Sequence, residues 1–243
     1  MGELIRDEIN LILPNYSTNN LKIYRCRSNN TNELFNNARN LWHPPKEKTP
    51  TGRLNFEKKP ILYTAHNAAT AMIEIEAYKY DHITTVEYKV KPEKLKTIEF
   101  GLKTISKNER SLMDERTRLI MEFLSREAKK KVSKERFYEY CPTIIFATSV
   151  TTNRRFDAFL YESVATNHSG LNFAFKSKFA EENLMPVEFR YIKIFNKINE
   201  NRFSVKCIAR TVNKYFDLDS DLIWTDVNDC SGHNINSEEF SYH

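Results

Sequence analysis

Short runs of apolar and alternating side chains predict a series of β-strands along the chain. Residues 61–65 (Ile-Leu-Tyr-Thr-Ala) are mostly apolar and are followed by two polar residues, which is typical of a short buried strand. Residues 83–90 and 156–164 alternate between apolar and polar positions, as half-exposed strands do. The same signals predict one further strand and a hairpin at residues 171–175, 187–198 and 203–212.

Helices are predicted where apolar residues recur at helical spacing. Residues 68–80 follow the first strand directly, and Asn67 can cap the helix that they form. Ser106 and Glu109 form a capping box in front of a second helix. Its apolar positions are Leu112, Met113, Leu119, Ile120, Phe123 and Leu124. A short helix is expected at residues 177–184.

One apolar stretch can be read in two ways. Residues 144–150 are rich in β-branched and aromatic side chains, which favour a strand, whereas Pro142 suits the first turn of a helix. With either reading, strands and helices are mixed along the chain. We therefore predict an α/β (α+β) fold with a mixed or antiparallel central sheet and flanking helices.

The chain is long enough for one large domain with extensions. Its 243 residues include 40% hydrophobic residues, enough to bury a full core. Residues 1–20 combine a short amphipathic start with a turn-rich linker, and we expect an N-terminal extension there. Residues 21–214 are expected to form the domain, and residues 215–243 an acidic tail.

The charge is unevenly spread. The whole chain carries +5, and residues 215–243 contribute seven acidic side chains and no Lys or Arg, so residues 1–214 carry +12. The basic body suits a small anionic substrate. Nucleic-acid binding is the weaker interpretation, because the basic residues are dispersed among acidic ones. The tail is either a disordered solubilising segment, or it folds back over a basic cleft or recruits a partner.

Cysteines and apolar runs set further bounds. The four cysteines lie far apart and form no C-x-x-C pair, so we expect reduced thiols and neither a metal site nor a disulfide framework. No apolar run approaches the length that crosses a bilayer, and the amino end alternates charge too early for a signal peptide. These features indicate a cytoplasmic protein that does not bind membranes.

Two candidate site residues lie on either side of the first strand. Gly52 is expected to take backbone angles closed to other residues and so to present Arg53, a possible anion fork, from a tight turn. In the helix at 68–80, Glu74 and Glu76 are roughly 200° apart around the axis and cannot share a face. Glu74 has mostly small neighbours that leave room for a ligand. The alternative is that both glutamates are solvated.

An arginine in an apolar pattern is a third candidate. Residues 21–27 alternate as a strand does, with Ile23, Arg25 and Arg27 on one face. Because an unpaired buried charge is costly, Arg25 lies on a sheet edge, has an acidic partner or points into a polar cleft. In the irregular residues 28–50, the dipeptide Trp42-His43 is either a lid over the site or a packed anchor.

Six segments together resemble the RES domain family, which is named for an arginine, a glutamate and a serine. They are Ile23-Tyr-Arg-Cys-Arg27, Pro44-Pro-Lys-Glu-Lys-Thr-Pro-Thr-Gly-Arg-Leu-Asn55, Ile61-Leu-Tyr-Thr-Ala65, Ala69-Thr-Ala-Met-Ile-Glu74, Phe156-Asp-Ala-Phe-Leu-Tyr-Glu-Ser163 and Gly170-Leu-Asn172. The resemblance covers roughly residues 21–197. It implies a fold related to ADP-ribosyltransferases, a helix at residues 144–153, and NAD as substrate rather than cofactor.

The resemblance also implies an activity. Family members are typically bacterial toxins that cleave the nicotinamide–ribose bond of NAD with water or inorganic phosphate, and many are neutralised by an antitoxin protein. Some are described as ADP-ribosyltransferases. We therefore expect an NAD glycohydrolase or NAD phosphorylase. The alternatives are a transferase that modifies a protein or nucleic acid, and a non-catalytic nucleotide-binding module.

By position, the three naming residues fall on Arg25, Glu74 and Ser163, which we assign as catalytic. Glu74 suits the stabilisation of positive charge at the anomeric carbon. Arg25 and Arg53 suit bidentate binding of the pyrophosphate. The residue before the serine is usually proline in the family but is Glu162 here, which adds a charge near the site.

The remaining binding assignments are secondary. Ser163 is expected to bind the nicotinamide-side ribose or amide, and Tyr24 or Tyr63 to stack on a ring. Asn172, in the Gly-Leu-Asn segment, is added to the predicted NAD-binding residues.

Overall fold

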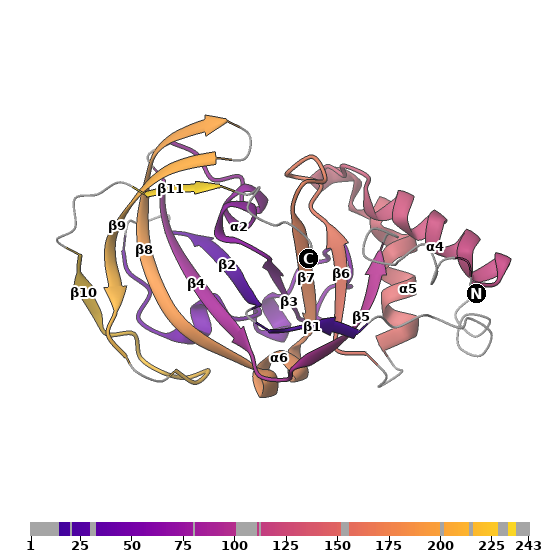
Figure 1. The fold of residues 1–243 in the computed structure, drawn as a ribbon, viewed down its shortest axis with the longest axis horizontal. Coiled ribbons are helices and arrows are strands. Elements are labelled where there is room, and N and C mark those ends of the chain that lie inside the picture. Colours follow the sequence, from indigo (N-terminus) through magenta and orange to yellow (C-terminus); the bar gives the residue numbers. More distant parts are fainter. Residues whose placement is uncertain are drawn as a thin grey trace.

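The computed structural model describes residues 15–19, 21–29, 33–79, 81–100, 111, 113–151, 156–199, 202–213, 216–227 and 233–236. Within them one mixed sheet forms the centre of the molecule (Figure 1). Its strands are β1 (Asn15–Ser17), β2 (Lys22–Ser28), β3 (Ile61–Ala65), β4 (His82–Val90), β5 (Lys94–Phe100), β6 (Ala158–Glu162), β7 (Leu171–Lys176), β8 (Leu184–Asn199), β9 (Arg202–Thr211), β10 (Trp224–Asp226) and β11 (His233–Asn236).

The helices flank this sheet. The α-helices of the described residues are α2 (Ala68–Glu74), α4 (Glu115–Ala128), α5 (Cys141–Thr151) and α6 (Ser177–Asn183). Short 3-10 helices are η1 (Ala38–Leu41), η2 (Lys46–Lys48) and η3 (Lys134–Tyr140). The predicted α/β (α+β) class with flanking helices is therefore confirmed.

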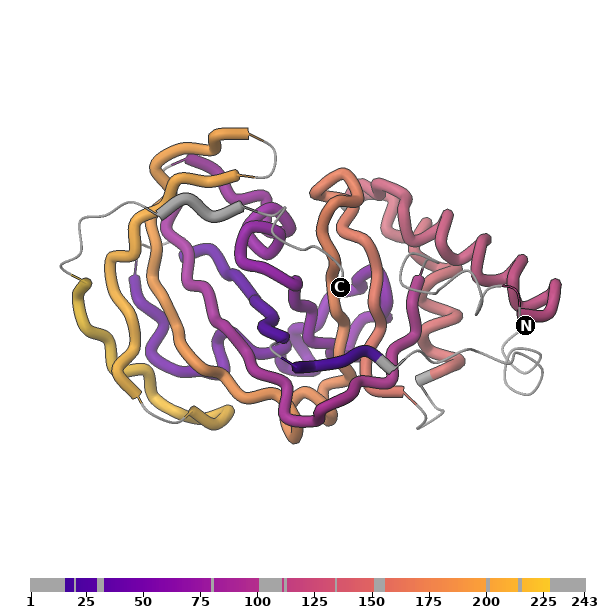
Figure 2. Tube along the Cα trace, in the orientation of Figure 1, coloured from indigo at the N-terminus to yellow at the C-terminus, as the bar shows by residue number. Residues whose placement is uncertain are grey.

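The strand order is β1-β5-β6-β7-β3-β2-β4-β8-β9-β10, and β11 also pairs with β9. Among these strands β5 and β6 are parallel, and the other pairs are antiparallel. Figures 1 and 2 show that the sheet is strongly curved, with β4, β8 and β9 in one arm and β5, β6 and β7 in the other. Helix α2 lies between the arms, and α4 and α5 lie outside the arm that contains β5 and β6.

Three hydrophobic clusters hold these layers together. The largest joins the two arms of the sheet and includes Leu62, Val86, Leu160, Phe173 and Phe189. A second lies between β5, β6 and the α4–α5 layer and includes Phe100, Met121, Leu124, Phe146 and Phe159. A third packs α2 on the sheet and includes Met72, Ile73, Ile192 and Phe203. Helix α2 thus covers apolar residues of one part of the sheet, and helices α4 and α5 cover those of β5 and β6.

Helix α5 settles the ambiguous stretch. Residues 144–150 lie within a helix and not in a strand, as the family resemblance implied and against their β-propensity. Pro142 occupies the first turn, where its missing N–H costs no hydrogen bond. Packing decides the conformation, because Phe146, Ala147 and Val150 are buried between the sheet and α4.

Only part of the predicted apolar face of helix α4 is buried: Leu124 lies in the core and Ile120 packs against it. Its N-cap is Asp114, which accepts a hydrogen bond from the Thr117 backbone N–H at 2.8 Å. Ser106, Glu109 and Leu112 lie outside the described residues. Leu119 and Phe123 were predicted to be core residues, but they are 54% and 42% exposed. Thr117 and Glu127 are buried instead, because Asp114 binds the Thr117 hydroxyl and Lys130 pairs with Glu127 at 2.6 Å.

Helix α2 is shorter than the predicted 68–80. Asn67 caps its start as expected, accepting from the Thr70 N–H at 2.7 Å. At the other end Glu76 has a φ of 56°, and the N–H groups of Glu76 and Ala77 donate to the carbonyls of Ile73 and Met72 at 2.9 and 3.0 Å. This is a Schellman motif with a glutamate in the left-handed position that glycine usually takes. Glu76 is thus beyond the helix rather than on its opposite face.

The Trp42 segment is a packed anchor, so the lid interpretation is wrong. Trp42 is buried and meets Tyr88 of β4 edge-on, with 5.0 Å between ring centroids. The Tyr88 hydroxyl donates to the Leu41 carbonyl at 2.9 Å. His43 pairs with Glu181 at 2.8 Å. These contacts attach residues 41–43 to β4 and α6.

The described part of the acidic tail is folded. Phe216 packs edge-on against Phe189, with centroids 5.0 Å apart, and Trp224 donates its ring N–H to the Phe35 carbonyl at 2.9 Å. Asp219 pairs with Arg39 at 2.6 Å. The disordered-tail alternative is therefore wrong for residues 216–227. Asp229, Glu238 and Glu239 lie outside the described residues.

Two further sequence expectations can be compared with the described residues. Cys26, Cys141 and Cys207 are free thiols, as predicted, and Cys230 lies outside the described residues. None of the described helices is both long and apolar enough to cross a membrane.

Candidate active site

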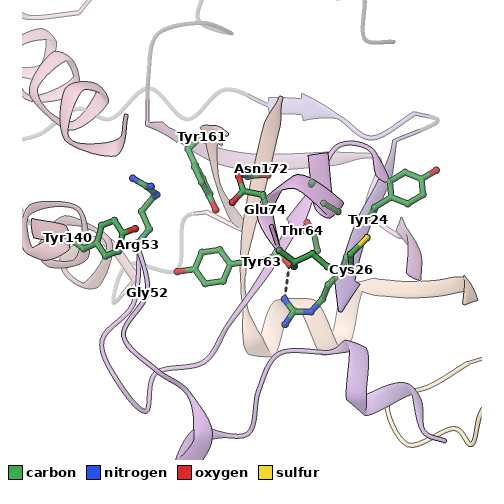
Figure 3. Close-up of a pocket in the computed structure, with 14 residues that line it drawn as sticks. Tyr24, Cys26, Gly52, Arg53, Tyr63, Thr64, Glu74, Tyr140, Tyr161 and Asn172 are labelled. Atoms are coloured by element: carbon green, nitrogen blue, oxygen red, sulfur yellow. Dashed lines mark hydrogen bonds between the residues drawn. The ribbon is translucent and has the colours of Figure 1, made fainter. Parts of the chain in front are cut away.

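A cavity of about 310 Å³ opens where the carboxyl end of β3, the start of β7 and helix α2 meet (Figure 3). Six of the seven predicted site residues line it: Tyr24, Arg25, Arg53, Tyr63, Glu74 and Asn172. The remaining lining residues are Cys26, Gly52, Thr64, Ala65, Ala71, Ile75, Tyr140 and Tyr161. The seventh predicted residue, Ser163, lies directly behind Glu74.

The Glu74 carboxylate is held through one of its two oxygens. Oε1 accepts hydrogen bonds from the Ser163 hydroxyl and from the Asn172 side-chain N–H, both at 2.6 Å. Within the described part of the chain no hydrogen bond to Oε2 accompanies them. Ser163 and Asn172 are 0% and 2% exposed, whereas Glu74 is exposed to the cavity. The arrangement fixes the carboxylate through Oε1, so Glu74 is oriented although it is exposed.

The turn after β6 positions Ser163. The Thr166 N–H donates to the Ser163 hydroxyl oxygen at 3.2 Å, and the Thr166 hydroxyl donates to the Ser163 carbonyl at 3.2 Å. Gly170 closes the turn against α2, where a Cβ would lie 2.6 Å from the Thr70 hydroxyl. Only glycine allows this approach. Because Ser163 is fully buried, the geometry favours a role in positioning Glu74 over the predicted contact with nicotinamide or its ribose.

Arg25 lies on an interior strand. Strand β2 runs between β3 and β4, so the sheet-edge alternative is wrong. The Arg25 Nη1 donates to the Tyr63 carbonyl at 2.9 Å, and burial lowers the pKa of the guanidinium from its usual value. No ion pair to Arg25 is found among the described residues, and the side chain lines the cavity. The sheet-edge possibility is excluded, and the polar cleft stays a prediction, with Arg25 among the residues that line the cavity.

The turn that carries Arg53 requires glycine for space. The Gly52 N–H donates to the Asn55 carbonyl at 2.9 Å. A Cβ on Gly52 would lie 2.6 Å from Asn55 Oδ1 and 3.1 Å from the Tyr63 hydroxyl. The predicted reason, backbone angles closed to other residues, is therefore wrong, since this close approach excludes a side chain without any left-handed φ.

Arg53 is shared between the cavity and helix α4. Its Nη1 donates to the Ala128 carbonyl at 2.6 Å, and both Nη atoms lie 3.3 Å from the Lys130 carbonyl. The guanidinium also lies over the Tyr140 ring, 4.9 Å from its centroid. Terminal carbonyls of a helix need such donors. A guanidinium has five N–H donors, and among the described residues the hydrogen bonds of Arg53 come from Nη1 and Nη2, so Nε can still donate to an anion.

Tyrosines form the walls between these charges. The Tyr63 hydroxyl donates to Asn55 Oδ1 at 2.7 Å, and the Tyr24 hydroxyl donates to Glu87 Oε2 at 3.0 Å. Burial raises the pKa of both phenols. Burial, followed by the nearby charge of Glu74, raises the pKa of Tyr161 well above its usual value. The walls are therefore neutral, aromatic and suited to a flat ring.

Comparison with known proteins assigns the chain. A scan against protein-family models matches residues 22–189 to the RES domain. The chain belongs to the RES domain family. A search of curated proteins returned no match.

Glu162 stands where the family usually has proline, and it does not line the cavity. Its carboxylate lies 3.3 Å from the Lys129 Nζ and 3.6 Å from His168 Nδ1, and its side chain is 10% exposed. Lys129 therefore neutralises the added charge. Glu162 therefore adds no unpaired charge to the cavity.

Among the residues of the RES domain cavity that the sequence did not predict, Tyr140 and Tyr161 are the two aromatic ones. Tyr161 had a signal, because it shares a strand face with Ser163 in the alternation of β6. Tyr140 had none, since it comes from η3, far from the family segments. In the part of the chain that the structure describes, no group of three or more His, Cys, Asp and Glu side chains could hold a metal ion.

Proposed function

We propose that this RES domain cleaves the bond between nicotinamide and ribose in NAD, with water or inorganic phosphate as acceptor. The observation that carries the proposal is Glu74, whose Oε1 is held by two donors while its Oε2 is left for a ligand in the cavity. Membership of the RES domain family supports this proposal, because a glutamate is one of the three residues for which the family is named.

The chemistry demands little acid catalysis. When the bond between C1′ and the pyridinium nitrogen breaks, its electron pair goes to the nitrogen and nicotinamide leaves as a neutral molecule. Positive charge develops at C1′ and the ring oxygen of the ribose. A carboxylate that is already oriented stabilises this charge without having to reorganise. Glu74, held by Ser163 and Asn172, supplies that carboxylate.

The arginines would bind the pyrophosphate. Arg25 offers a guanidinium whose hydrogen bond within the protein is to a carbonyl, and Arg53 offers the Nε donor that α4 does not use. Charge-assisted, bidentate hydrogen bonds from arginine suit pyrophosphate oxygens. A volume of 310 Å³ lies at the lower end of ligand pockets, about 300–1,000 Å³. The cavity therefore suits one half of a dinucleotide.

The acceptor completes the reaction. A water oxygen that bonds to C1′ loses a proton and yields ADP-ribose, and a phosphate oxygen yields the 1-phosphate of ADP-ribose. A second candidate is ADP-ribosyl transfer to a macromolecule, which is favoured by the exposure of Glu74 at the cavity. The family resemblance adds a role as a bacterial toxin, cytoplasmic because its substrate is there, with an antitoxin as partner.

Product identification tests the proposal. The protein is incubated with NAD, with and without phosphate, and the products are separated by chromatography and mass spectrometry. We expect nicotinamide and the 1-phosphate of ADP-ribose only in the reaction with phosphate if phosphate is the acceptor, and nicotinamide and ADP-ribose in both reactions if water is the acceptor. Label that appears on a protein or nucleic acid favours the transferase. Unchanged NAD after long incubation contradicts the proposal and favours a non-catalytic binding module.

A further inference from the structure

The last turn of α4 is held from two sides by residues of the site. Arg53 donates to the carbonyls of Ala128 and Lys130, at 2.6 and 3.3 Å. The residue between these two carbonyls is Lys129, whose Nζ reaches Glu162 at 3.3 Å. Three consecutive residues at the end of α4, Ala128 to Lys130, are thus bonded to the Arg53 turn and to the end of β6.

The two contacts lead to different parts of the site. Arg53 lines the cavity itself. Glu162 does not, but it is followed directly by Ser163, which binds Glu74. The end of α4 therefore joins the Arg53 turn to the end of β6. Without the Lys129–Glu162 pair, the end of α4 would keep its apolar packing through Ala128 but lose its ion pair to the end of β6.

The electrostatic surroundings show that this pair is more than a surface contact. The Glu162 side chain is 10% exposed and that of Lys129 is 40% exposed. Exposed pairs contribute little, whereas a buried carboxylate that loses its partner is strongly unfavourable. The other group facing Glu162 is His168, at 3.6 Å. Lys130 is turned to Glu127, so it does not share this role.

We propose that Glu162 and Lys129 are a pair of positioning residues that set the aim of Arg53 toward a bound pyrophosphate. This inference rests on the proposed function, because the anion is part of NAD. The pair acts on binding, through Arg53. It leaves the hydrogen bonds between Glu74, Ser163 and Asn172 in place, so the bond-breaking step is not affected.

The test compares Glu162→Gln and Lys129→Met with Lys131→Met, an exposed lysine that follows in the same segment. Steady-state kinetics with NAD should show a KM about tenfold higher in the first two variants and kcat within about twofold of wild type. Lys131→Met should be unchanged in both. A loss of kcat with unchanged KM, or an unchanged KM in both pair variants, overturns the proposal.

A charge exchange separates positioning from plain stability. The double variant Glu162→Lys with Lys129→Glu restores an opposite pair, and KM should return to within about threefold of wild type. If the pair had only a general structural role, the single variants would have a lower melting temperature and the double variant would not recover the wild-type KM. A double variant as poor in KM as the singles, although folded, overturns the proposal. If the exchange does not fold, Lys129→Arg takes its place and should keep the wild-type KM.

Hydrogen exchange tests, without NAD, whether the Lys129–Glu162 pair holds the end of α4. The amides of Lys129 and Lys130 donate to carbonyls of α4, at 3.1 and 3.3 Å. They should exchange about tenfold faster in Glu162→Gln than in wild type or Lys131→Met. Wild-type protein that does not consume NAD contradicts the proposed function alone, and the exchange result then decides whether the pair holds the helix end. Equal exchange in Glu162→Gln and wild type overturns the positioning role.

Discussion

The two ends of the cavity are built from different kinds of structure. At the carboxylate end, Glu74 comes from a helix of seven residues and is bonded to side chains at the end of β6 and the start of β7. At the arginine end, Arg53 comes from a turn and is bonded to backbone carbonyls of α4. The position of Glu74 is thus set by residues of the sheet, whereas the position of Arg53 depends on how α4 packs against the sheet. Changes at the first end should act on turnover and changes at the second on binding.

The largest effect is expected for Glu74→Gln. The amide has almost the same shape but no charge, so it cannot stabilise the cation at C1′. We expect kcat to fall by about 10² to 10³, as for the loss of one preorganised electrostatic group. NAD affinity and the melting temperature should stay near wild type. Steady-state kinetics, calorimetry and thermal unfolding measure the three quantities.

Glu76→Gln is the matched control. Glu76 is exposed beyond the end of α2 and does not line the cavity. Its change to glutamine should leave kcat and KM unaltered. Equal losses in both variants would point to damage to the helix, and full activity in Glu74→Gln would move the catalytic carboxylate elsewhere.

The next largest effect concerns the arginine end. Arg25→Ala and Arg53→Ala should each weaken NAD binding by about 1.5 to 3 kcal/mol, the scale of hydrogen bonds to a charged group. Calorimetry measures this loss. Arg53→Ala should also lower the melting temperature, because it leaves the carbonyls of Ala128 and Lys130 without their donor. Wild-type affinity in both variants would refute the assignment of the pyrophosphate to these arginines.

A smaller effect on turnover is expected for Ser163→Ala. It removes one of the two donors to Glu74 Oε1 and keeps the one from Asn172. We expect kcat to fall about tenfold, or ~1.4 kcal/mol, with KM nearly unchanged. If Ser163 instead contacts the substrate, the same variant should raise KM, and this result would move the serine from the support of Glu74 to the binding surface.

The smallest effect is a gain in stability from Glu76→Gly. A residue other than glycine in the left-handed region costs about 1 kcal/mol or more, which is partly offset by the greater entropy of glycine in the unfolded chain. We expect a stabilisation of about 0.5 kcal/mol, measured by denaturant unfolding. Activity should not change. Destabilisation would show that the Glu76 side chain makes a contact that supports the end of α2.

Strands were easier to predict than helix ends, for a local reason. The alternation in residues 83–90 and the apolar run at 61–65 are set by burial on a sheet, and both became strands. The end of α2 had no signal, because the left-handed position holds Glu76 where a glycine would have marked the stop. The core face of α4 was partly misjudged because Thr117 is buried with its hydroxyl satisfied.

The cavity could be predicted as a set of residues but not as a set of contacts. Arg25, Arg53, Tyr63 and Glu74 all line it, as the sequence segments indicated. The bonds from Arg53 to α4 could not be foreseen, because backbone carbonyls are present at every residue and leave no sequence pattern. The burial of Ser163 depends on the turn that Gly170 closes, and this packing too is visible only in three dimensions.

The parallel pairing of β5 and β6 has a consequence for the order of folding. Parallel neighbours need a crossover connection, and here the connection contains α4, η3 and α5. Contacts that close such long loops form slowly. The antiparallel neighbours β8 and β9 follow each other closely in sequence and can form early. We therefore expect Arg53 to gain its helix partner only in the final stage of folding, after the hairpin strands are in place.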